Sequence, residues 1–233
     1  MLFHHSYGVV KRICMGKQEK IFLKSEADQW FNRNINSIKN IKDDSITSAI
    51  KEMNLNPTTI LEVGCSNGYR LAKLQKDYHA ACYGIEPSKK AIIQGQKSFP
   101  EIIFKQGVAT QLPYENAKFD MVIFGFCLYL CSRDNLFQIA AEADRVLADK
   151  GQLIIFDFHT SYPYKNKYSH SKNINSYKFD HSKIFAWNPS YEIIYLKKES
   201  HDQTILDLEN EDNIISVTIL SKTLNGWRDR IKY

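Results

Sequence analysis

Residues 60–68 read Ile60-Leu61-Glu62-Val63-Gly64-Cys65-Ser66-Asn67-Gly68, an apolar run that passes into a turn with two glycines. Pro57 stands just before the run. This order predicts a β-strand, a tight turn and a helix that begins near Asn67. Glycine lets the backbone approach a ligand closely, and the first turn of a helix presents unpaired amide donors. The stretch therefore has the geometry of a nucleotide-binding loop.

The same alternation of strand and helix extends over residues 58–158. Apolar runs predict five strands, at residues 59–63, 80–85, 102–105, 121–126 and 152–158. The clearest helix is predicted over residues 132–150, with Ser132 as its N-cap and Gly151 at its end. Two further strands, at residues 191–197 and 214–220, are expected to close the sheet as an antiparallel edge. The pattern predicts an α/β fold.

Two regions flank or interrupt this pattern. Residues 1–56 are predicted to form an N-terminal helical cap or lid, and residues 57–233 the main domain. Within the main domain, residues 161–191 form an insertion after the fifth strand that is rich in aromatic residues. The insertion has five lysines against one acid, Asp180, and we expect it to shape a substrate site for an anionic ligand. The alternative is a packed cap whose aromatic residues belong to the core and whose lysines face solvent.

Composition sets limits on the class of protein. The 233 residues are 43% hydrophobic and 24% charged, which excludes collagen-like and wholly disordered chains. A net charge of +5 permits a nucleic-acid partner without demanding one. Five cysteines, an odd number with no zinc-type spacing, indicate a reducing compartment and no metal site. No stretch reaches 18 apolar residues, so we predict a cytoplasmic protein with no membrane partner.

The glycine turn distinguishes between two classes of cofactor. The dinucleotide fingerprint G-x-G-x-x-G fails at Ser66 and Tyr69, which disfavours a dinucleotide-dependent oxidoreductase. The pattern acid-x-G-x-G-x-G matches at Glu62, Gly64 and Gly68 and departs only at Ser66. In this respect the chain resembles class I S-adenosylmethionine-dependent methyltransferases. A carboxylate before the turn suits the positively charged amino group of that cofactor and would repel a pyrophosphate.

Later segments extend the resemblance, in order, over residues 58–158. Glu86 ends the second predicted strand 22 residues after Gly64, the spacing of a carboxylate that accepts both ribose hydroxyls. Val108 and Ala109 correspond to the segment that borders adenine, although Val108 replaces the acid often found there. The resemblance implies a Rossmann-like seven-stranded sheet, mostly parallel with an antiparallel edge strand, and S-adenosylmethionine as cofactor. The cofactor-binding residues that it implies are Glu62, Gly64, Cys65, Ser66, Gly68, Glu86, Pro87, Val108, Ala109, Leu112 and Phe124.

The resemblance implies methyl transfer to oxygen or nitrogen of a small molecule. The lysines and aromatic residues of the insertion predict that this acceptor is an anionic metabolite, such as a nucleotide-linked or phosphorylated sugar. His159, directly after the fifth strand, is a candidate general base or a plain loop residue, and Tyr129 is a candidate for orienting the acceptor. Asp157 faces either solvent or the pocket. An RNA methyltransferase is the alternative, although no Asn-Pro-Pro-Tyr motif follows the fourth strand. A non-catalytic cofactor-binding module of the same fold is a third interpretation.

Overall fold

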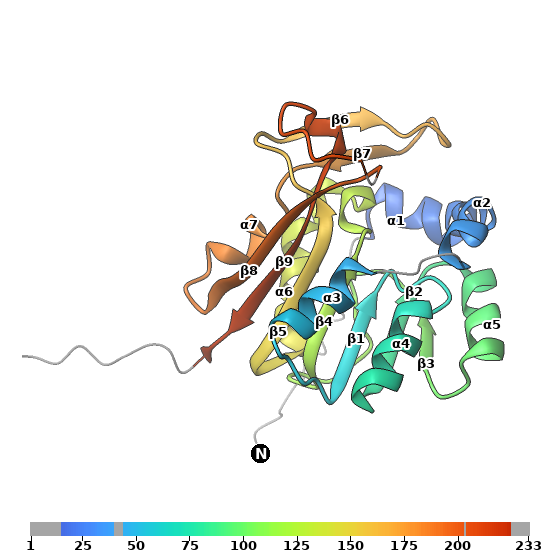
Figure 1. The fold of residues 1–233 in the computed structure, drawn as a ribbon. Helices are drawn as coiled ribbons and strands as arrows, with labels where there is room; N and C mark the ends of the chain where they lie inside the picture. Colours follow the sequence, from blue (N-terminus) through green and yellow to red (C-terminus); the bar gives the residue numbers. More distant parts are fainter. Residues whose placement is uncertain (1–14, 40–43, 203, 225–233) are drawn as a thin grey trace, which may run out of the picture.

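A seven-stranded sheet forms the centre of the molecule (Figure 1). The computed structural model describes residues 15–39, 44–202 and 204–224, so the predicted cap lies only in part within it. The strand order is β3-β2-β1-β4-β5-β9-β8; the first five strands are parallel, and β9 is antiparallel to both of its neighbours. This topology confirms the predicted fold class. The strands are β1 (Thr59–Val63), β2 (Ala81–Glu86), β3 (Ile103–Gln106), β4 (Phe119–Gly125), β5 (Leu147–Phe158), β8 (Tyr191–Ser200) and β9 (Ile214–Lys222).

Helices cover both faces of the sheet (Figure 1). One face packs against α3 (Ser45–Glu52), α4 (Tyr69–Tyr78) and α5 (Lys89–Ser98), and the other against α6 (Leu136–Val146) and α7 (Lys183–Ala186). Because side chains alternate along a strand, Ile60 of β1 joins the α3–α4 side whereas Leu61 and Val63 join the α6 side. Burial on both faces explains why these strands are continuous apolar runs. The alternation of side chains along β1 also places Glu62 on the α3–α4 side of the sheet.

The helix predicted over residues 132–150 is wrong at both ends. The α-helix begins at Leu136, after a single 3₁₀ turn at Arg133–Asn135, and ends at Val146. The hydroxyl of Ser132 does not cap this helix; it donates to the Glu19 carboxylate and accepts the backbone amide of Gln18 at 3.3 Å. Leu147 pairs with Phe119 on β4, so residues 147–150 belong to β5. Sheet pairing overrides the helical spacing of the apolar residues here.

The N-terminal segment lies over the carboxyl ends of the parallel strands (Figure 1). It consists of α1 (Lys17–Ile21), a π-helical turn at Phe22–Glu26 and α2 (Ala27–Lys39). Phe31 and Ile38 of α2 pack with Ala91 of α5. The side-chain amide of Gln18 in α1 donates to the carbonyl of Leu130 at 2.7 Å and to that of Asn175 at 3.1 Å. This segment therefore contacts both the loop after β4 and the insertion.

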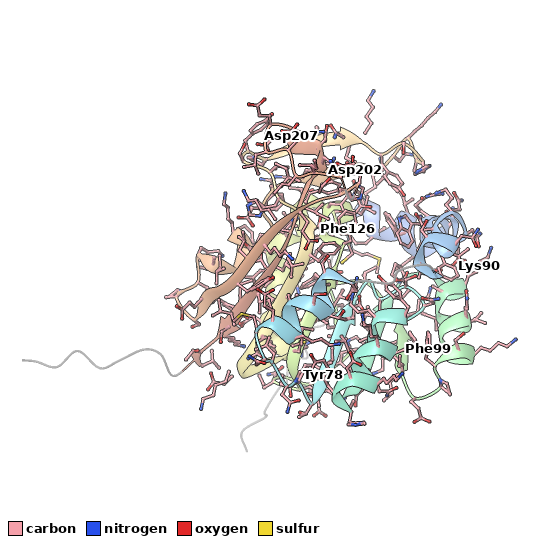
Figure 2. The ribbon with its side chains drawn as sticks, viewed as in Figure 1. Tyr78, Lys90, Phe99, Phe126, Asp202 and Asp207 are labelled. Carbon is pink, nitrogen blue, oxygen red and sulfur yellow. The ribbon has the colours of Figure 1, made fainter. Side chains whose placement is uncertain are left out.

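The insertion contains a two-stranded hairpin of β6 (Tyr164–Lys167) and β7 (Asn175–Lys178), followed by α7. The loop between β8 and β9 packs beside the hairpin, because Asp212 accepts hydrogen bonds from Tyr164 and from Lys178 at 2.8 and 2.7 Å. Figure 2 shows Asp202 and Asp207 of this acidic loop at the same end of the molecule. Within the described residues, no helix is long and apolar enough to span a membrane.

Candidate functional site

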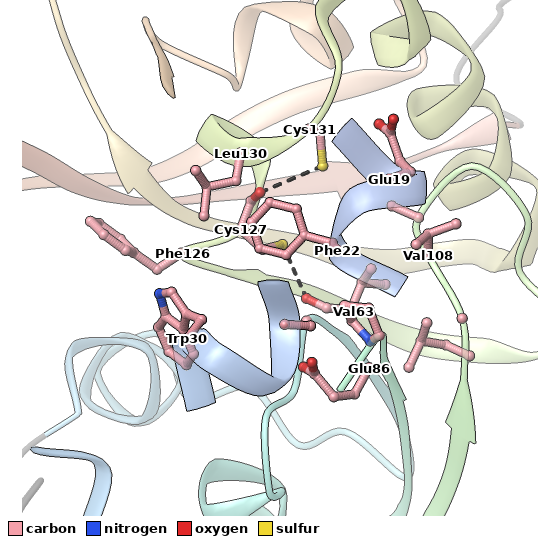
Figure 3. A pocket seen from close by; sticks show the side chains of 16 residues that line it. Glu19, Phe22, Trp30, Val63, Glu86, Val108, Phe126, Cys127, Leu130 and Cys131 are labelled. Atoms are coloured by element: carbon pink, nitrogen blue, oxygen red, sulfur yellow. Dashed lines mark hydrogen bonds between the residues drawn. The ribbon is translucent and has the colours of Figure 1, made fainter. Parts of the chain in front are cut away.

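A cavity of about 110 Å³ opens where β1, β2 and β4 end, beneath the N-terminal segment (Figure 3). The carboxyl ends of parallel strands are where open α/β sheets bind ligands. Its lining consists of Glu19, Phe22, Ala27, Trp30, Val63, Gly64, Ile85, Glu86, Pro87, Gly107, Val108, Ala109, Phe126, Cys127, Leu130 and Cys131. Five predicted cofactor residues are among them, namely Gly64, Glu86, Pro87, Val108 and Ala109. The other six, Glu62, Cys65, Ser66, Gly68, Leu112 and Phe124, are not among the lining residues.

The turn after β1 has backbone conformations that favour glycine. Gly64 and Gly68 have φ of +76° and +77°. A Cβ atom on Gly64 would lie 2.8 Å from the Cβ of Cys127, and one on Gly68 would lie 2.5 Å from the ring of Phe104. Ser66, the departure from the glycine pattern, also has a positive φ, of +51°. The serine therefore keeps the backbone path of the turn although it lacks the freedom of glycine.

Glu86 lies at the end of β2 and faces the cavity (Figure 3). Its carboxylate accepts the amide of Ser66 and the amide of Ser88, each at 2.8 Å. Burial raises the pKa of Glu86 to about 7, although the hydrogen bonds from Ser88 and Ser66 act to lower it. These bonds hold the side chain between the glycine turn and the start of α5. The carboxylate is thus fixed at the cavity wall where β2 ends.

Glu62 belongs to a buried charged cluster beside the turn. Arg70 of α4 donates to Glu62, and its Nε donates to Asp44 at 2.9 Å. All three side chains are buried. One oxygen of Glu62, Oε2, has no hydrogen-bond partner among the described residues. The cluster fixes the carboxylate that the resemblance assigns to the amino group of the cofactor.

Several buried polar atoms around the turn lack partners within the described residues. They are Glu62 Oε2, Ser66 Oγ, Asn67 Oδ1 and Thr110 Oγ1. Native structures rarely leave such atoms unpaired, so they are the expected contacts of a polar ligand or water. Beside them, Ile85 and Val108 supply apolar walls to the cavity. A polar turn beside an apolar slot fits the amino acid and adenine parts of S-adenosylmethionine.

Glu19 and its neighbours form the wall opposite Glu86. Its carboxylate accepts the backbone amide of Ser132 at 2.8 Å and the hydroxyl of Ser132 at 2.5 Å. Phe22, Trp30 and Leu130 line the cavity beside it (Figure 3). The sequence did not single out Glu19, because its partner is 113 residues away.

The two predicted catalytic residues do not line this cavity. The Nδ1 of His159 is 3.0 Å from the hydroxyl of Ser216 on β9 and 3.7 Å from Asp180. Burial lowers the pKa of His159, although the nearby Asp180 carboxylate acts to raise it. The ring of Tyr129 packs against those of Phe126 and Phe158, with centroids 5.0 and 5.3 Å apart. Burial raises the pKa of Tyr129.

Asp157, whose direction the sequence left open, points inward. It is 1% exposed and accepts the amides of Leu128 and Tyr129 at 2.9 and 3.2 Å. Burial raises the pKa of Asp157 to about 7, although the hydrogen bonds from the backbone of Phe158, Tyr129 and Leu128 act to lower it. His181 of the insertion lies 3.9 Å away, and burial lowers the pKa of this histidine to about 3. Asp157 therefore holds the loop that lines the cavity after β4.

Comparisons of sequence agree with this geometry. Residues 60–151 match the family model of the methyltransferase domain. The phthiotriol/phenolphthiotriol dimycocerosates methyltransferase of Mycobacterium leprae is 31% identical over 113 residues, which are 47% of this chain and 41% of that protein. An uncharacterized methyltransferase of Synechocystis sp. is 27% identical over 100 residues, 43% of this chain and 47% of that protein. The similarity thus spans less than half the length of either relative.

Solved structures share the fold at low sequence identity. The 1,6-didemethyltoxoflavin-N1-methyltransferase of Burkholderia thailandensis, solved with S-adenosylhomocysteine, has a TM-score of 0.67 and 15% identity, covering 88% of each chain. An S-adenosylmethionine-dependent methyltransferase from Methanosarcina mazei has a TM-score of 0.62 and 16% identity, covering 76% of this chain and 98% of the other. The family match and these structures indicate S-adenosylmethionine as the cofactor. This chain has the Rossmann-like fold of class I S-adenosylmethionine-dependent methyltransferases, and its residues 60–151 match the methyltransferase domain.

Proposed function

We propose that this protein transfers the methyl group of S-adenosylmethionine to an oxygen or nitrogen atom of a small molecule. The observation that carries the proposal is the position of Glu86, which faces the cavity at the end of β2 and is fixed by two amides. Support also comes from the match of residues 60–151 to the methyltransferase domain. A non-catalytic protein has no need of a buried acid on each side of the glycine turn, since burying carboxylates is costly.

The residues of the chain bind and orient the reactants. The cofactor supplies an electrophilic methyl group on a positively charged sulfur. Glu86 is expected to accept the ribose hydroxyls, and the glycine turn with Glu62 to hold the amino acid part. Phe22 and Trp30 of the N-terminal segment line the cavity, and we expect them to exclude water from the bound reactants. Proximity and orientation are therefore the main catalytic contribution that we propose.

Truncation of the ribose acid tests the cofactor site directly. Glu86→Ala is expected to weaken binding of S-adenosylhomocysteine by about 1–3 kcal/mol, the cost of lost hydrogen bonds to a charged group. Isothermal titration calorimetry measures the change. Glu101→Ala, which removes an exposed carboxylate outside the cavity lining, is the control and should leave affinity unchanged. Equal affinities for wild type and Glu86→Ala would contradict the assignment.

The proposed chemistry does not require His159 as a base. Its Nδ1 is close to Ser216, and its side chain does not line the cavity. We expect His159→Asn to change the turnover number by no more than about threefold, whereas loss of a general base typically costs 10²–10⁴-fold. The measurement is the initial rate of methyl transfer to an identified acceptor, from pH 6 to 9. A loss near 100-fold would instead assign His159 as the base.

The acceptor pool can be found before the substrate itself is identified. Protein, labelled S-adenosylmethionine and fractionated cell extract are incubated, and label is counted in the metabolite and RNA fractions. We expect label in small metabolites. Label in RNA alone would replace the small-molecule proposal by an RNA methyltransferase. No transfer to either pool, together with no binding of S-adenosylhomocysteine, would overturn the proposed function.

A further inference from the structure

The part of the cavity wall that is not assigned to the cofactor has a distinct chemistry. Phe22, Trp30, Phe126 and Leu130 form this wall, with Ala27 and Cys131 between them. They come from the N-terminal segment and from the loop after β4. In Figure 3, Phe22 and Leu130 lie across the cavity from Glu86, whereas Trp30 lies on the same side as Glu86. We call these six residues the acceptor wall. Its assignment to the methyl acceptor rests on the proposed function.

Within the described residues, no lysine or arginine lines the cavity. The charged groups that do are two carboxylates, Glu19 and Glu86. Of the five lysines of the insertion, four are exposed. Lys178 is buried, and it binds Asp212 at 2.7 Å. An anionic acceptor would therefore lose water and meet two acids without a compensating cation from the protein lining, which is unfavourable.

The acceptor wall is also aromatic and held in place. Phe126 has a φ of +63°, a conformation that a bulky residue rarely adopts. Its amide donates to the carbonyl of Phe156 at 2.7 Å. Its ring stacks on His201, with centroids 5.2 Å apart and planes 5° apart. Strained backbone that the surrounding contacts maintain is common at ligand sites. The wall thus presents fixed flat surfaces rather than adaptable polar groups.

We propose that the methyl acceptor is an uncharged, flat aromatic or heteroaromatic molecule that stacks against Trp30 and Phe126. Its reacting oxygen or nitrogen points toward the cofactor side of the cavity, and its remaining surface contacts Phe22 and Leu130. This class differs from the anionic metabolite that the lysines of the insertion predict, because those lysines lie outside the cavity lining. Aromatic stacking and apolar contact provide the affinity.

A matched pair of probes separates the two classes of acceptor. Full-length protein is first titrated with S-adenosylhomocysteine, and the complex is then titrated calorimetrically with 2-naphthol or with 2-naphthol-6-sulfonate. We expect the neutral probe to bind at least about tenfold more tightly than the sulfonate, the factor that 1.4 kcal/mol represents. Equal or tighter binding of the sulfonate, or no binding of either probe, overturns the inference. Failure to bind S-adenosylhomocysteine would instead refute the proposed function.

Two variants test the acceptor wall itself. Trp30→Ala is expected to weaken 2-naphthol binding about tenfold, whereas Trp187→Ala, which removes an exposed tryptophan away from the cavity, should leave it unchanged. Phe22→Lys places a cation in the wall and should shift the preference toward the sulfonate. Binding of S-adenosylhomocysteine reports that each variant is folded. The assignment of this wall is wrong if Trp30→Ala weakens binding of S-adenosylhomocysteine as much as binding of 2-naphthol. It is also wrong if Phe22→Lys leaves the preference for 2-naphthol over the sulfonate unchanged.

Discussion

Replacing Arg70 by methionine is expected to lower the free energy of unfolding by about 3–5 kcal/mol, the usual cost of removing one partner from a buried ion pair. Arg70 is 5% exposed and bridges Glu62 of β1 and Asp44, which precedes α3. Burial by itself lowers the pKa of Arg70, but the Glu62 and Asp44 carboxylates raise it well above its usual value. Without the guanidinium, two carboxylates remain buried with no cation beside them. Denaturation by guanidinium chloride, followed by circular dichroism, measures the loss.

Two further variants sharpen this prediction. Arg133→Met removes a guanidinium that is 73% exposed, so it should change the free energy of unfolding little. Glu62→Gln combined with Arg70→Met should recover part of the loss, because one of the two unpaired charges is then gone. An unfolding free energy of Arg70→Met within about 1 kcal/mol of wild type would contradict the buried cluster.

The difference in stability between Glu86→Gln and wild type is expected to depend strongly on pH. The folded pKa of Glu86 is about 7, above its ordinary value of 4.5. The folded state therefore holds this proton more tightly, so the stabilising contribution is complete below pH 4.5 and is lost as pH rises through 7. Glutamine cannot ionise, so the variant does not lose stability in this way as the pH rises. Relative to wild type, the free energy of unfolding of the variant should rise by on the order of 3 kcal/mol between pH 4.5 and pH 8.

The comparison with the variant matters because other buried groups titrate in the same range. Burial raises the pKa of Asp157 and lowers that of His181, and the two have opposite effects on stability as pH rises. Their contributions cancel in the difference between two proteins that share them. Bound S-adenosylhomocysteine should reduce the effect, because ribose hydroxyls stabilise the ionised carboxylate. A stability difference that is constant from pH 4.5 to 8 would show that Glu86 titrates normally.

The sheet was largely predictable from the sequence, because parallel strands buried on both faces are short apolar runs. All seven predicted strands are present. The end of α6 was not predictable in the same way, since Val146 and Leu147 are both buried but belong to a helix and a strand. Pairing of Leu147 with Phe119 decides the boundary, and local spacing does not contain that information.

The candidate site was predictable where it follows directly from strand ends. Gly64 and Glu86 line the cavity because each stands where a strand ends. The partner of Glu62 had a signal in the sequence: an acid in a buried strand needs a cation, and Arg70 is the first one after the turn. The contacts of Gln18 and Glu19 had no such signal in the sequence, since their partners are 112 to 157 residues away. The roles of His159 and Tyr129 stay predictions.

The strand order has a consequence for synthesis of the chain. β9 lies between β5 and β8, although β8 comes first in the sequence. Residues 191–200 therefore leave the ribosome before the strand that joins them to the sheet exists. Until residues 214–222 dock, the backbone groups of β5 over residues 152–158 that pair with β9 have no strand to bond. Such an open edge can pair with another nascent chain. Completion of the sheet and protection from aggregation are thus a single, late event.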